Sequence, residues 1–296
     1  MNIGIIGAGS IGMLFGAYLA EAKHNITFLV RNSNTPTKLY IEKSHTGQQL
    51  IPCTLVNSMD KLEKMDLIII AVKYHHLQSL KEGLDTLPKD IPLLFLQNGL
   101  LQLSFAANLK QDTILVGSVL HGAMKKDAQI VQHLGVGVTT IGMWKGEWER
   151  VGELFLRLNE HFPVEFSSKI EDVLFKKAML NSLINPLTTI ARVPNGALVQ
   201  NETYKTIVKN IYDEMMDVFE EWKNRLSWDE VVTLCTNTQH NHSSMLKDYE
   251  NGRLMELDTI VGAILEEASK RNKKLPILNT FYLLLKEKNK VGERHL

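Results

Sequence analysis

The chain has 296 residues, which is long enough for two domains with a sizeable core. Hydrophobic residues make up 44% of it and charged residues 22%, with 33 basic residues balancing 33 acidic ones. A net charge of zero argues against broad electrostatic binding to nucleic acid or to a membrane surface. Because no apolar run reaches the roughly 18 residues of a membrane-spanning helix and no signal peptide is visible, the sequence predicts a cytoplasmic protein.

The cysteines and histidines do not show the spacing of a metal site. Cys53 and Cys235 are the only cysteines and show no metal-ligand spacing, so we expect two free thiols. The histidines at 75–76 and 240–242 have no companion cysteine or acidic pattern of the kind that zinc sites use. The sequence therefore predicts no bound metal.

The first half of the chain alternates strand and helix patterns. Strands are expected at 2–6, 26–30, 66–72, 92–97 and 113–117, and helices at 11–23, 75–86 and 100–110. Such alternation predicts a parallel sheet with helices on both faces, which is a Rossmann-type doubly wound α/β fold. Short antiparallel strands between 118 and 142, a helix near 147–161 and a strand at 163–166 are expected to complete this domain.

After residue 166 the strand pattern gives way to helices. These are expected at 170–185, 203–223, 228–240, 256–271 and 276–289. Pro186 follows Asn185 directly, and because the residue before a proline disfavours α geometry, the first of these helices is expected to end or kink there. The predicted architecture is a dinucleotide-binding domain, 1–166, followed by an all-helical substrate and catalytic domain, 167–296.

A glycine-rich loop follows the first strand. The residues Gly7, Ala8, Gly9, Ser10, Ile11 and Gly12 match G-x-G-x-x-G between an expected strand and an expected helix. The first glycine permits a tight turn, the second lets a pyrophosphate approach the backbone, and the third lets the helix pack on the sheet. A tight turn without a ligand is the alternative, but the strand–loop–helix context favours a dinucleotide site.

Other residues follow strands at the edge where open α/β sheets bind ligands. The second strand ends in Arg31 rather than in an acidic residue, and a cation there suits the 2′-phosphate of NADPH. Lys73 and Asn98 follow two further strands, so we expect Lys73 to face a ligand charge and Asn98 to bridge cofactor and substrate. The alternatives are an arginine that simply ends a strand, a surface lysine and a turn asparagine.

A polar stripe interrupts the apolar segment 176–185. Lys177, Asn181 and Asn185 are spaced four residues apart and would lie on one side of a helix. A buried amide without a partner costs about 1–3 kcal/mol, so the stripe predicts a hydrogen-bonding ligand. The alternatives are solvated lysines on an exposed face and asparagines that cap or kink the helix.

With these residues in view, the chain resembles the ketopantoate reductase (2-dehydropantoate 2-reductase) family over essentially its whole length. The resemblance is carried by GAGSIG at 7–12, Arg31, AVK at 71–73, QNG at 97–99, FKKAMLNSLINPLTTI at 175–190, PNG at 194–196 and HSSMLKDYENGRLMELD at 242–258. It implies reduction of ketopantoate to pantoate by NADPH, on the way to pantothenate and coenzyme A.

The resemblance also implies roles for individual residues. The family's catalytic lysine corresponds to Lys177, because only this lysine keeps the four-residue step to Asn181, and its acidic residue corresponds to Glu256. The substrate-binding residues correspond to Asn98, Asn181, Asn185 and Ser244. The cofactor-binding residues correspond to the glycine loop, Arg31, Lys73 and Asn98.

These roles suggest a mechanism, which we state as a hypothesis. The stripe is expected to face a cleft between the domains, where Lys177 stabilises the charge that develops on the ketone oxygen and delivers a proton. Glu256 would orient the lysine or the distal hydroxyl of the substrate, and Ser244 with the asparagines would hold the carboxylate. The alternatives are that Ser244 with its neighbour Ser243 caps a helix and that Glu256 is an ordinary surface carboxylate.

Two positions depart from the family pattern and keep other functions open. Met255 replaces a threonine, and Val261 with Gly262 replaces Asn-Gly. One alternative is therefore a reductase of another small 2-oxo acid. A second, of a different class, is a dinucleotide sensor without catalysis, which would leave the Lys177 set unexplained. The helical domain has enough apolar surface to permit a homodimer.

Overall fold

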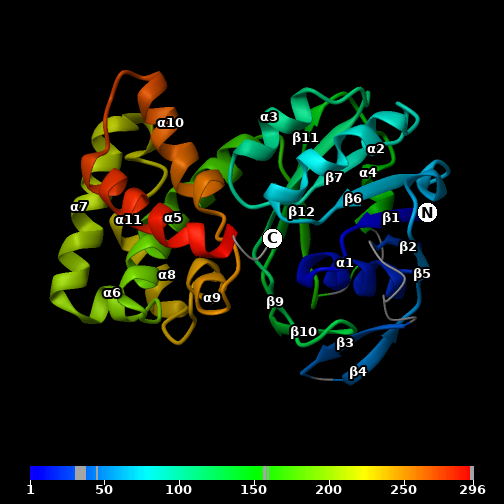
Figure 1. The fold of residues 1–296 in the computed structure, drawn as a ribbon, viewed down its shortest axis with the longest axis horizontal. Helices are drawn as coiled ribbons and strands as arrows, with labels where there is room; N and C mark the ends of the chain where they lie inside the picture. Colours follow the sequence, from blue (N-terminus) through cyan, green and yellow to red (C-terminus); the bar gives the residue numbers. More distant parts are fainter. Residues whose placement is uncertain (31–37, 45, 156–157, 159, 294–296) are drawn as a thin grey trace. The chain divides into compact units, whose positions relative to one another are not determined.

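The computed structural model describes residues 1–30, 38–44, 46–155, 158 and 160–293. The chain divides into two units: unit 1 holds residues 1–97 and 102–174, and unit 2 holds 98–101 and 175–296 (Figure 1). The short segment 98–101 thus belongs with the helices, although it follows a strand of unit 1. The division into two domains, 1–166 and 167–296, stays a prediction of the sequence.

Unit 1 is built on an eight-stranded sheet. Its strands are β1 (Asn2–Ile6), β2 (Asn25–Leu29), β5 (Thr54–Val56), β6 (Leu67–Ile70), β7 (Leu93–Phe95), β8 (Ile114–Val119), β11 (Thr139–Lys145) and β12 (Val164–Phe166). Six parallel strands lie in the order β5-β2-β1-β6-β7-β8, which is the Rossmann order 3-2-1-4-5-6. β11 joins β8 antiparallel, and β12 joins β11 in parallel. The predicted fold class is confirmed.

The apolar runs of the central strands explain their place in this sheet. All four residues of β6 are fully buried, as expected for a strand with both faces covered. The helices of unit 1 are α1 (Ser10–Glu21), α2 (Lys81–Thr86), α3 (Leu101–Ala107) and α4 (Val151–Phe155). The helix expected at 75–86 begins instead as two 3₁₀ turns, Tyr74–His76 and Gln78–Leu80. Ser79 Oγ donates to the His76 carbonyl there, a local bond that competes with a regular helix.

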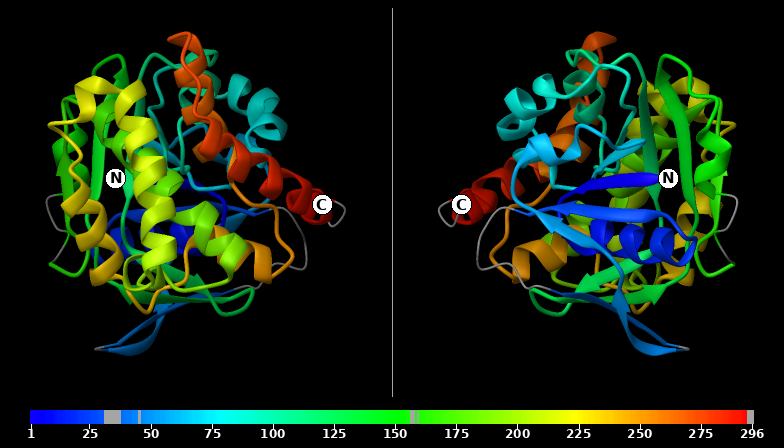
Figure 2. Two further views of the ribbon diagram at one scale, coloured as in Figure 1. Left: turned by 90° about the vertical axis from the view of Figure 1, so that its left-hand side faces the viewer. Right: turned by 90° about the vertical axis from the view of Figure 1, so that its right-hand side faces the viewer.

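A second, smaller sheet has the order β4-β3-β10-β9. Its strands are β3 (Leu39–Lys43), β4 (Gly47–Ile51), β9 (Gly122–Lys125) and β10 (Ile130–Gly135). The antiparallel β9–β10 pair was expected, but β3, β4 and β5 were missed. β3 was hard to recognise because a lysine occupies one of its buried positions: Lys43 pairs with Glu21 at 2.5 Å and lies over the ring of Tyr18. Both views in Figure 2 show β3 and β4 projecting from the large sheet.

Unit 2 contains helices throughout its described residues. They are α5 (Ile170–Ala191, which starts in unit 1), α6 (Ala197–Gln200), α7 (Glu202–Val218), α8 (Trp228–Asn237), α9 (Ser244–Glu250), α10 (Ala263–Lys270) and α11 (Pro276–Glu293), with a 3₁₀ turn at Glu220–Trp222 and a π-helical turn at Asp258–Gly262. One apolar core joins α5 to α7, α8, α10 and α11, and Figure 1 shows these helices gathered in one group. The short helix α6 was not predicted, and α9 was raised only in the alternative that Ser243 and Ser244 cap a helix. Across the described part of the chain, no helix is both long and apolar enough for a bilayer crossing.

The course of α5 corrects one prediction. The helix was expected to end or kink at Pro186; it does not end there but continues to Ala191. A proline inside a helix removes one backbone donor, and the bonds that two threonine hydroxyls make to nearby carbonyls do not replace it. Thr188 Oγ1 donates to the Ile184 carbonyl at 3.0 Å, and Thr189 Oγ1 donates to the Asn185 carbonyl at 2.7 Å. Packing on both sides of Pro186 then keeps the segment helical.

Candidate active site

The glycine loop has the geometry that a phosphate ligand needs. Gly7 has a φ of +107°, and a Cβ on Gly12 would lie 2.0 Å from the Gly7 carbonyl oxygen, so neither position accepts a side chain. A Cβ on Gly9 would meet only the Ala71 carbonyl oxygen at 3.9 Å, which leaves open space above the loop. α1, all of it described, starts with no side-chain cap and no acidic residue in its first turn. Its first N–H groups therefore suit an anion, as the dinucleotide hypothesis requires.

The other predicted cofactor residues of unit 1 are less well defined. Lys73 follows β6 and is half-buried at the start of a 3₁₀ turn. Arg31 lies outside the described residues. Gln97, noted from the sequence only as part of QNG at 97–99, is a buried side chain whose Nε2 donates to the carbonyls of Ile70 and Val72 at 2.8 and 2.9 Å. These bonds fix the end of β7 against the end of β6, so Gln97 shapes the edge where the predicted ligand groups lie.

The turn after β7, residues 98–101, belongs to unit 2 and is bonded to a distant segment of that same unit. Asn98 Nδ2 donates to Glu256 Oε2 at 2.9 Å, and the Leu100 N–H donates to the Thr259 carbonyl at 3.0 Å. Gly99 has a φ of +82°, and a Cβ there would lie 2.0 Å from the Thr259 carbonyl oxygen. Only glycine fits this approach to the π-helical turn, so the turn brings two predicted site residues, Asn98 and Glu256, into direct contact.

Lys177 lies on α5 with a half-buried side chain. Burial lowers the pKa of Lys177 to about 8, and the nearby Glu256 carboxylate acts in the opposite direction. A pKa near neutrality suits a group that must both hold and release a proton. The neighbouring Lys176 instead forms an ion pair with Glu230 at 2.6 Å. The two lysines therefore have different environments, and it is the pKa of Lys177 on which the Glu256 carboxylate acts.

The two asparagines of the stripe differ in burial. Asn181 is half-buried, whereas Asn185 is 4% exposed. Among the described residues, no hydrogen-bond partner is found for Asn185 Nδ2. A buried amide donor without a partner is costly, so Asn185 is a donor that an incoming acceptor would satisfy.

The serine pair at the start of α9 divides two roles. Ser243 is buried and caps the helix by accepting from the Leu246 N–H at 3.2 Å. Its hydroxyl also bonds Thr188 Oγ1 at 2.9 Å, which fastens α9 to α5 close to Asn185. Ser244 is exposed at the first position of the helix. Of the two hydroxyls, the one predicted to bind substrate is therefore the one that is not engaged in capping.

A residue that the sequence did not suggest holds the backbone next to Glu256. Asn289 on α11 is buried; its Oδ1 accepts from the Met255 N–H at 2.8 Å and its Nδ2 donates to the Met255 carbonyl at 3.4 Å. The sequence signal that could have indicated a buried Asn289 is its position four residues after Leu285, on the apolar face of α11. The Met255 side chain and Val261, the two departures from the family pattern, are both buried in the core of unit 2.

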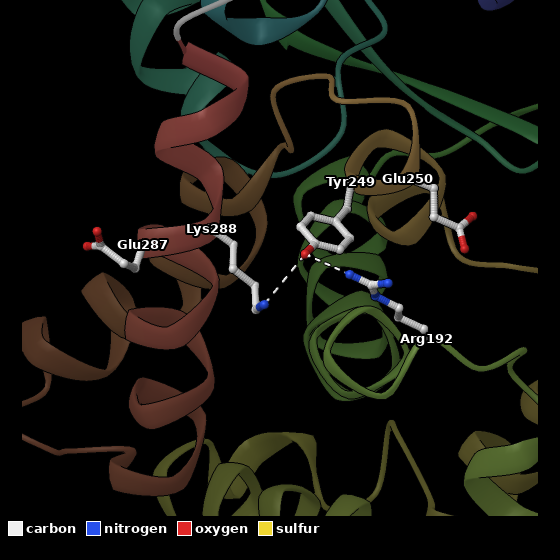
Figure 3. A pocket seen from close by; sticks show the side chains of 5 residues that line it. All are labelled: Arg192, Tyr249, Glu250, Glu287 and Lys288. Carbon is white, nitrogen blue, oxygen red and sulfur yellow. Dashed lines mark hydrogen bonds between the residues drawn. The ribbon is translucent and has the colours of Figure 1, made fainter.

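Unit 2 also has an open cavity of about 620 Å³ away from these residues. It is lined by Arg192, Tyr249, Glu250, Glu287 and Lys288 (Figure 3). The Tyr249 hydroxyl accepts hydrogen bonds from Arg192 at 3.2 Å and from Lys288 at 3.5 Å, and these bonds lower its pKa. Two acidic residues balance the two cations, and none of the predicted site residues lines this cavity.

The parallel sheet and its glycine loop define a dinucleotide-binding protein of the Rossmann class, joined here to a helical unit with a lysine–glutamate–asparagine set. Two family models match the chain: ketopantoate reductase PanE/ApbA over residues 3–146, and its C-terminal counterpart over residues 169–289. The chain belongs to the ketopantoate reductase family, which confirms the predicted resemblance.

Individual relatives agree with this assignment. The chain is 33% identical to a 2-dehydropantoate 2-reductase of Listeria innocua, over 100% of this chain and 99% of the relative. A crystal structure of a probable 2-dehydropantoate 2-reductase from Bacillus subtilis superposes with a TM-score of 0.85 and 30% identity, covering 97% of this chain and 100% of that one. A D-mandelate dehydrogenase solved with NADH shares the fold, with a TM-score of 0.84, 23% identity and 99% coverage of both chains.

Proposed function

We propose that this protein reduces 2-dehydropantoate to pantoate, with NADPH as the hydride donor and Lys177 as the proton donor. Relatives that match the full length of the chain carry the name of this activity. The structural observation that supports the proposal most strongly is the Glu256 carboxylate, which accepts from Asn98 at 2.9 Å and acts on Lys177, whose pKa burial lowers to about 8. A protein that only senses dinucleotides has no need for such a group.

The proposed reaction is a ketone reduction. NADPH, when bound, supplies the hydride to the ketone carbon of the substrate. Negative charge then develops on the ketone oxygen, where the Lys177 ammonium stabilises it and transfers its proton. The lysine is left as a neutral amine and regains a proton from solvent, so one hydride and one proton are consumed for each alcohol formed.

The remaining polar residues would bind and orient the substrate. Glu256, held by Asn98, would orient Lys177 or accept a hydrogen bond from the distal hydroxyl of the substrate. Asn181, Asn185 and Ser244 would hold the carboxylate and the ketone. The unpartnered amide of Asn185 supports this assignment, since a substrate oxygen would satisfy a donor that is otherwise left without an acceptor in the described structure.

The cofactor assignment depends on both the loop and the end of β2. The glycine loop, with Lys73 and Asn98, would bind the dinucleotide, and Arg31 would bind the 2′-phosphate that distinguishes NADPH from NADH. Because a protein of the same fold holds NADH, the preference rests on Arg31 rather than on the fold. The cytoplasmic location and a homodimer stay predictions of the sequence.

The test follows the absorbance of reduced nicotinamide with 2-dehydropantoate, using NADPH and NADH in parallel. Wild type is compared with Lys177→Ala and with Lys176→Ala, a matched change one residue away whose lysine is paired with Glu230. We expect NADPH-dependent turnover that falls by roughly 100-fold or more in Lys177→Ala and stays near wild type in Lys176→Ala.

Turnover of a different 2-oxo acid, with none of 2-dehydropantoate, would overturn the proposed substrate. Binding of NADPH without turnover of any 2-oxo acid would favour a sensor. Met255 and Val261 gave the sequence-based reason to consider another substrate, but both side chains are in the core of unit 2.

A further inference from the structure

The edge strand of the small sheet lies beside the glycine loop. β9 packs against α1, and its last residue, Lys125, contacts the loop at two points. The Lys125 N–H donates to Ser10 Oγ at 3.0 Å, and its Nζ donates to the Ala8 carbonyl at 2.9 Å. All of these residues belong to unit 1. A positive charge is therefore held on the loop by a residue more than 100 positions away.

The environment of Lys125 differs from that of the lysines around it. Lys126 pairs with Glu42 at 2.8 Å, and Lys43 pairs with Glu21. Within the described part of the chain, Lys125 forms no ion pair with a carboxylate; its ammonium contacts a neutral carbonyl. The Lys125 side chain is exposed; partial desolvation still lowers its pKa, and Asp127 partly opposes this effect. In the described structure, Lys125 therefore lacks the carboxylate ion pair that Lys43 and Lys126 have, and its ammonium lies on the loop instead.

We propose that Lys125 binds the pyrophosphate of the dinucleotide, as a further cofactor-binding residue beyond the glycine loop itself. An ammonium carries three donors, so Lys125 can keep its bond to the Ala8 carbonyl and offer the others to phosphate oxygens. The space above Gly9 and the uncapped start of α1 lie on the same short loop. A lysine that neutralises a diphosphate here adds charge to a site whose backbone donors carry only partial charges.

This assignment rests on the proposed use of a nicotinamide dinucleotide, and it makes a distinct prediction about specificity. NADPH and NADH share the pyrophosphate and differ in the 2′-phosphate. Loss of Lys125 should therefore weaken both cofactors by the same factor. Loss of Arg31, if it binds the 2′-phosphate, should weaken NADPH alone. The two cations can be separated by comparing the two cofactors.

The experiment measures cofactor dissociation constants by calorimetric titration, without substrate, for wild type, Lys125→Met and Lys126→Met. Lys125→Met keeps the apolar stem and the backbone N–H that binds Ser10, and removes only the ammonium. We expect roughly tenfold weaker binding of both NADPH and NADH, the size of a charge-assisted hydrogen bond. Lys126→Met, which removes an adjacent lysine paired with Glu42, should stay within about twofold of wild type, since its charge is already neutralised.

Lys125→Arg should retain most of the affinity for both cofactors, which shows that charge rather than side-chain shape is required. Unchanged binding by Lys125→Met would overturn the proposal, as would a loss confined to NADPH, which would place the lysine on the 2′-phosphate. If the wild type binds neither cofactor, the proposed function fails along with this inference. Matched thermal unfolding of the variants confirms that the loop has not simply unfolded.

Discussion

Asn98 donates a 2.9 Å hydrogen bond to Glu256, a residue 158 positions later in the chain. The contact lies entirely within unit 2, because residues 98–101 belong to the helical unit although they directly follow a strand of the sheet. A residue predicted from its place at the sheet edge and a residue predicted from a helical motif thus form one polar group. The predictions below test how this group is built and what it does.

The first prediction concerns the turn that carries Asn98. Gly99→Ala places a Cβ about 2.0 Å from the Thr259 carbonyl oxygen at a φ of +82°. We expect a loss of roughly 2 kcal/mol or more in the free energy of unfolding, together with reduced turnover, because Asn98 shifts away from Glu256. Urea denaturation and steady-state kinetics measure the two effects.

Gly47→Ala is the matched control for this change. Gly47 has a φ of +71° but nothing within 4 Å of a Cβ, so alanine there adds backbone strain without a collision. Its destabilisation should be clearly smaller than that of Gly99→Ala, and turnover should stay at the wild-type level. Equal losses of unfolding free energy in the two variants would mean that the collision with Thr259 does not contribute to the destabilisation.

The second prediction concerns the pH dependence of turnover. Because Lys177 must be protonated to act as an acid, kcat should fall as the pH rises through about 8. Glu256 raises the pKa of Lys177 against the effect of burial. Glu256→Gln should therefore move this fall to lower pH. A fall that stays in place in the variant would show that the titrating group is not coupled to Glu256.

The ionisation of Lys177 also affects stability: rising pH lowers kcat but raises the free energy of unfolding. The folded pKa of Lys177 lies below the ordinary lysine value of 10.5, so between about pH 8 and 10.5 the unfolded chain binds more protons than the native one. The free energy of unfolding should rise with pH in that window. Lys177→Met should lose this part of the rise, whereas Lys176→Met should keep it. Urea denaturation across the window measures both slopes.

The third prediction concerns Asn289, which holds the backbone before Glu256. Asn289→Leu leaves the Met255 N–H and carbonyl without this partner in a buried region, at a cost of about 1–3 kcal/mol. Turnover at neutral pH should be lower than in the wild type. The pH above which kcat decreases should also move lower, as in Glu256→Gln, because the carboxylate is displaced. pH–rate profiles detect this shift, which loss of stability alone would not produce.

Asn279→Leu is the control on the same helix, since Asn279 is exposed. It should change neither stability nor the pH profile. Asn289→Asp keeps an acceptor for the Met255 N–H and should recover part of the stability lost in Asn289→Leu. A normal pH profile in Asn289→Leu would show that Glu256 keeps its position without the clamp.

The fourth prediction separates the two serines of α9. Ser243→Ala removes the cap and the bond to Thr188, so the free energy of unfolding should fall by about 1 kcal/mol or more. Ser244→Ala should leave stability unchanged and raise KM for the substrate, since Ser244 is exposed and is proposed to bind it. The reverse pattern, with a KM effect at Ser243 alone, would exchange the two roles.

Much of the fold could be predicted because its signals are local. A fully apolar strand such as β6, or a glycine loop between a strand and a helix, shows its role within a few residues. The missed elements have weak local patterns. β3 carries a buried lysine whose charge is paired only in the folded chain, and α5 passes through Pro186 because the residues on both sides of it are buried in the core of unit 2.

The sequence alone determined the fold class, the loop for the dinucleotide and the polar stripe of α5, since each depends on periodicity or spacing along one segment. Only the tertiary structure decided that Asn98 bonds Glu256, and that Asn289 bonds the backbone of Met255, the residue before Glu256. The tertiary structure further decided that Lys125 contacts the glycine loop. It also decided the lowered pKa of Lys177. Hydrogen bonds between distant segments and the removal of water from a charge arise from packing, which no local pattern records.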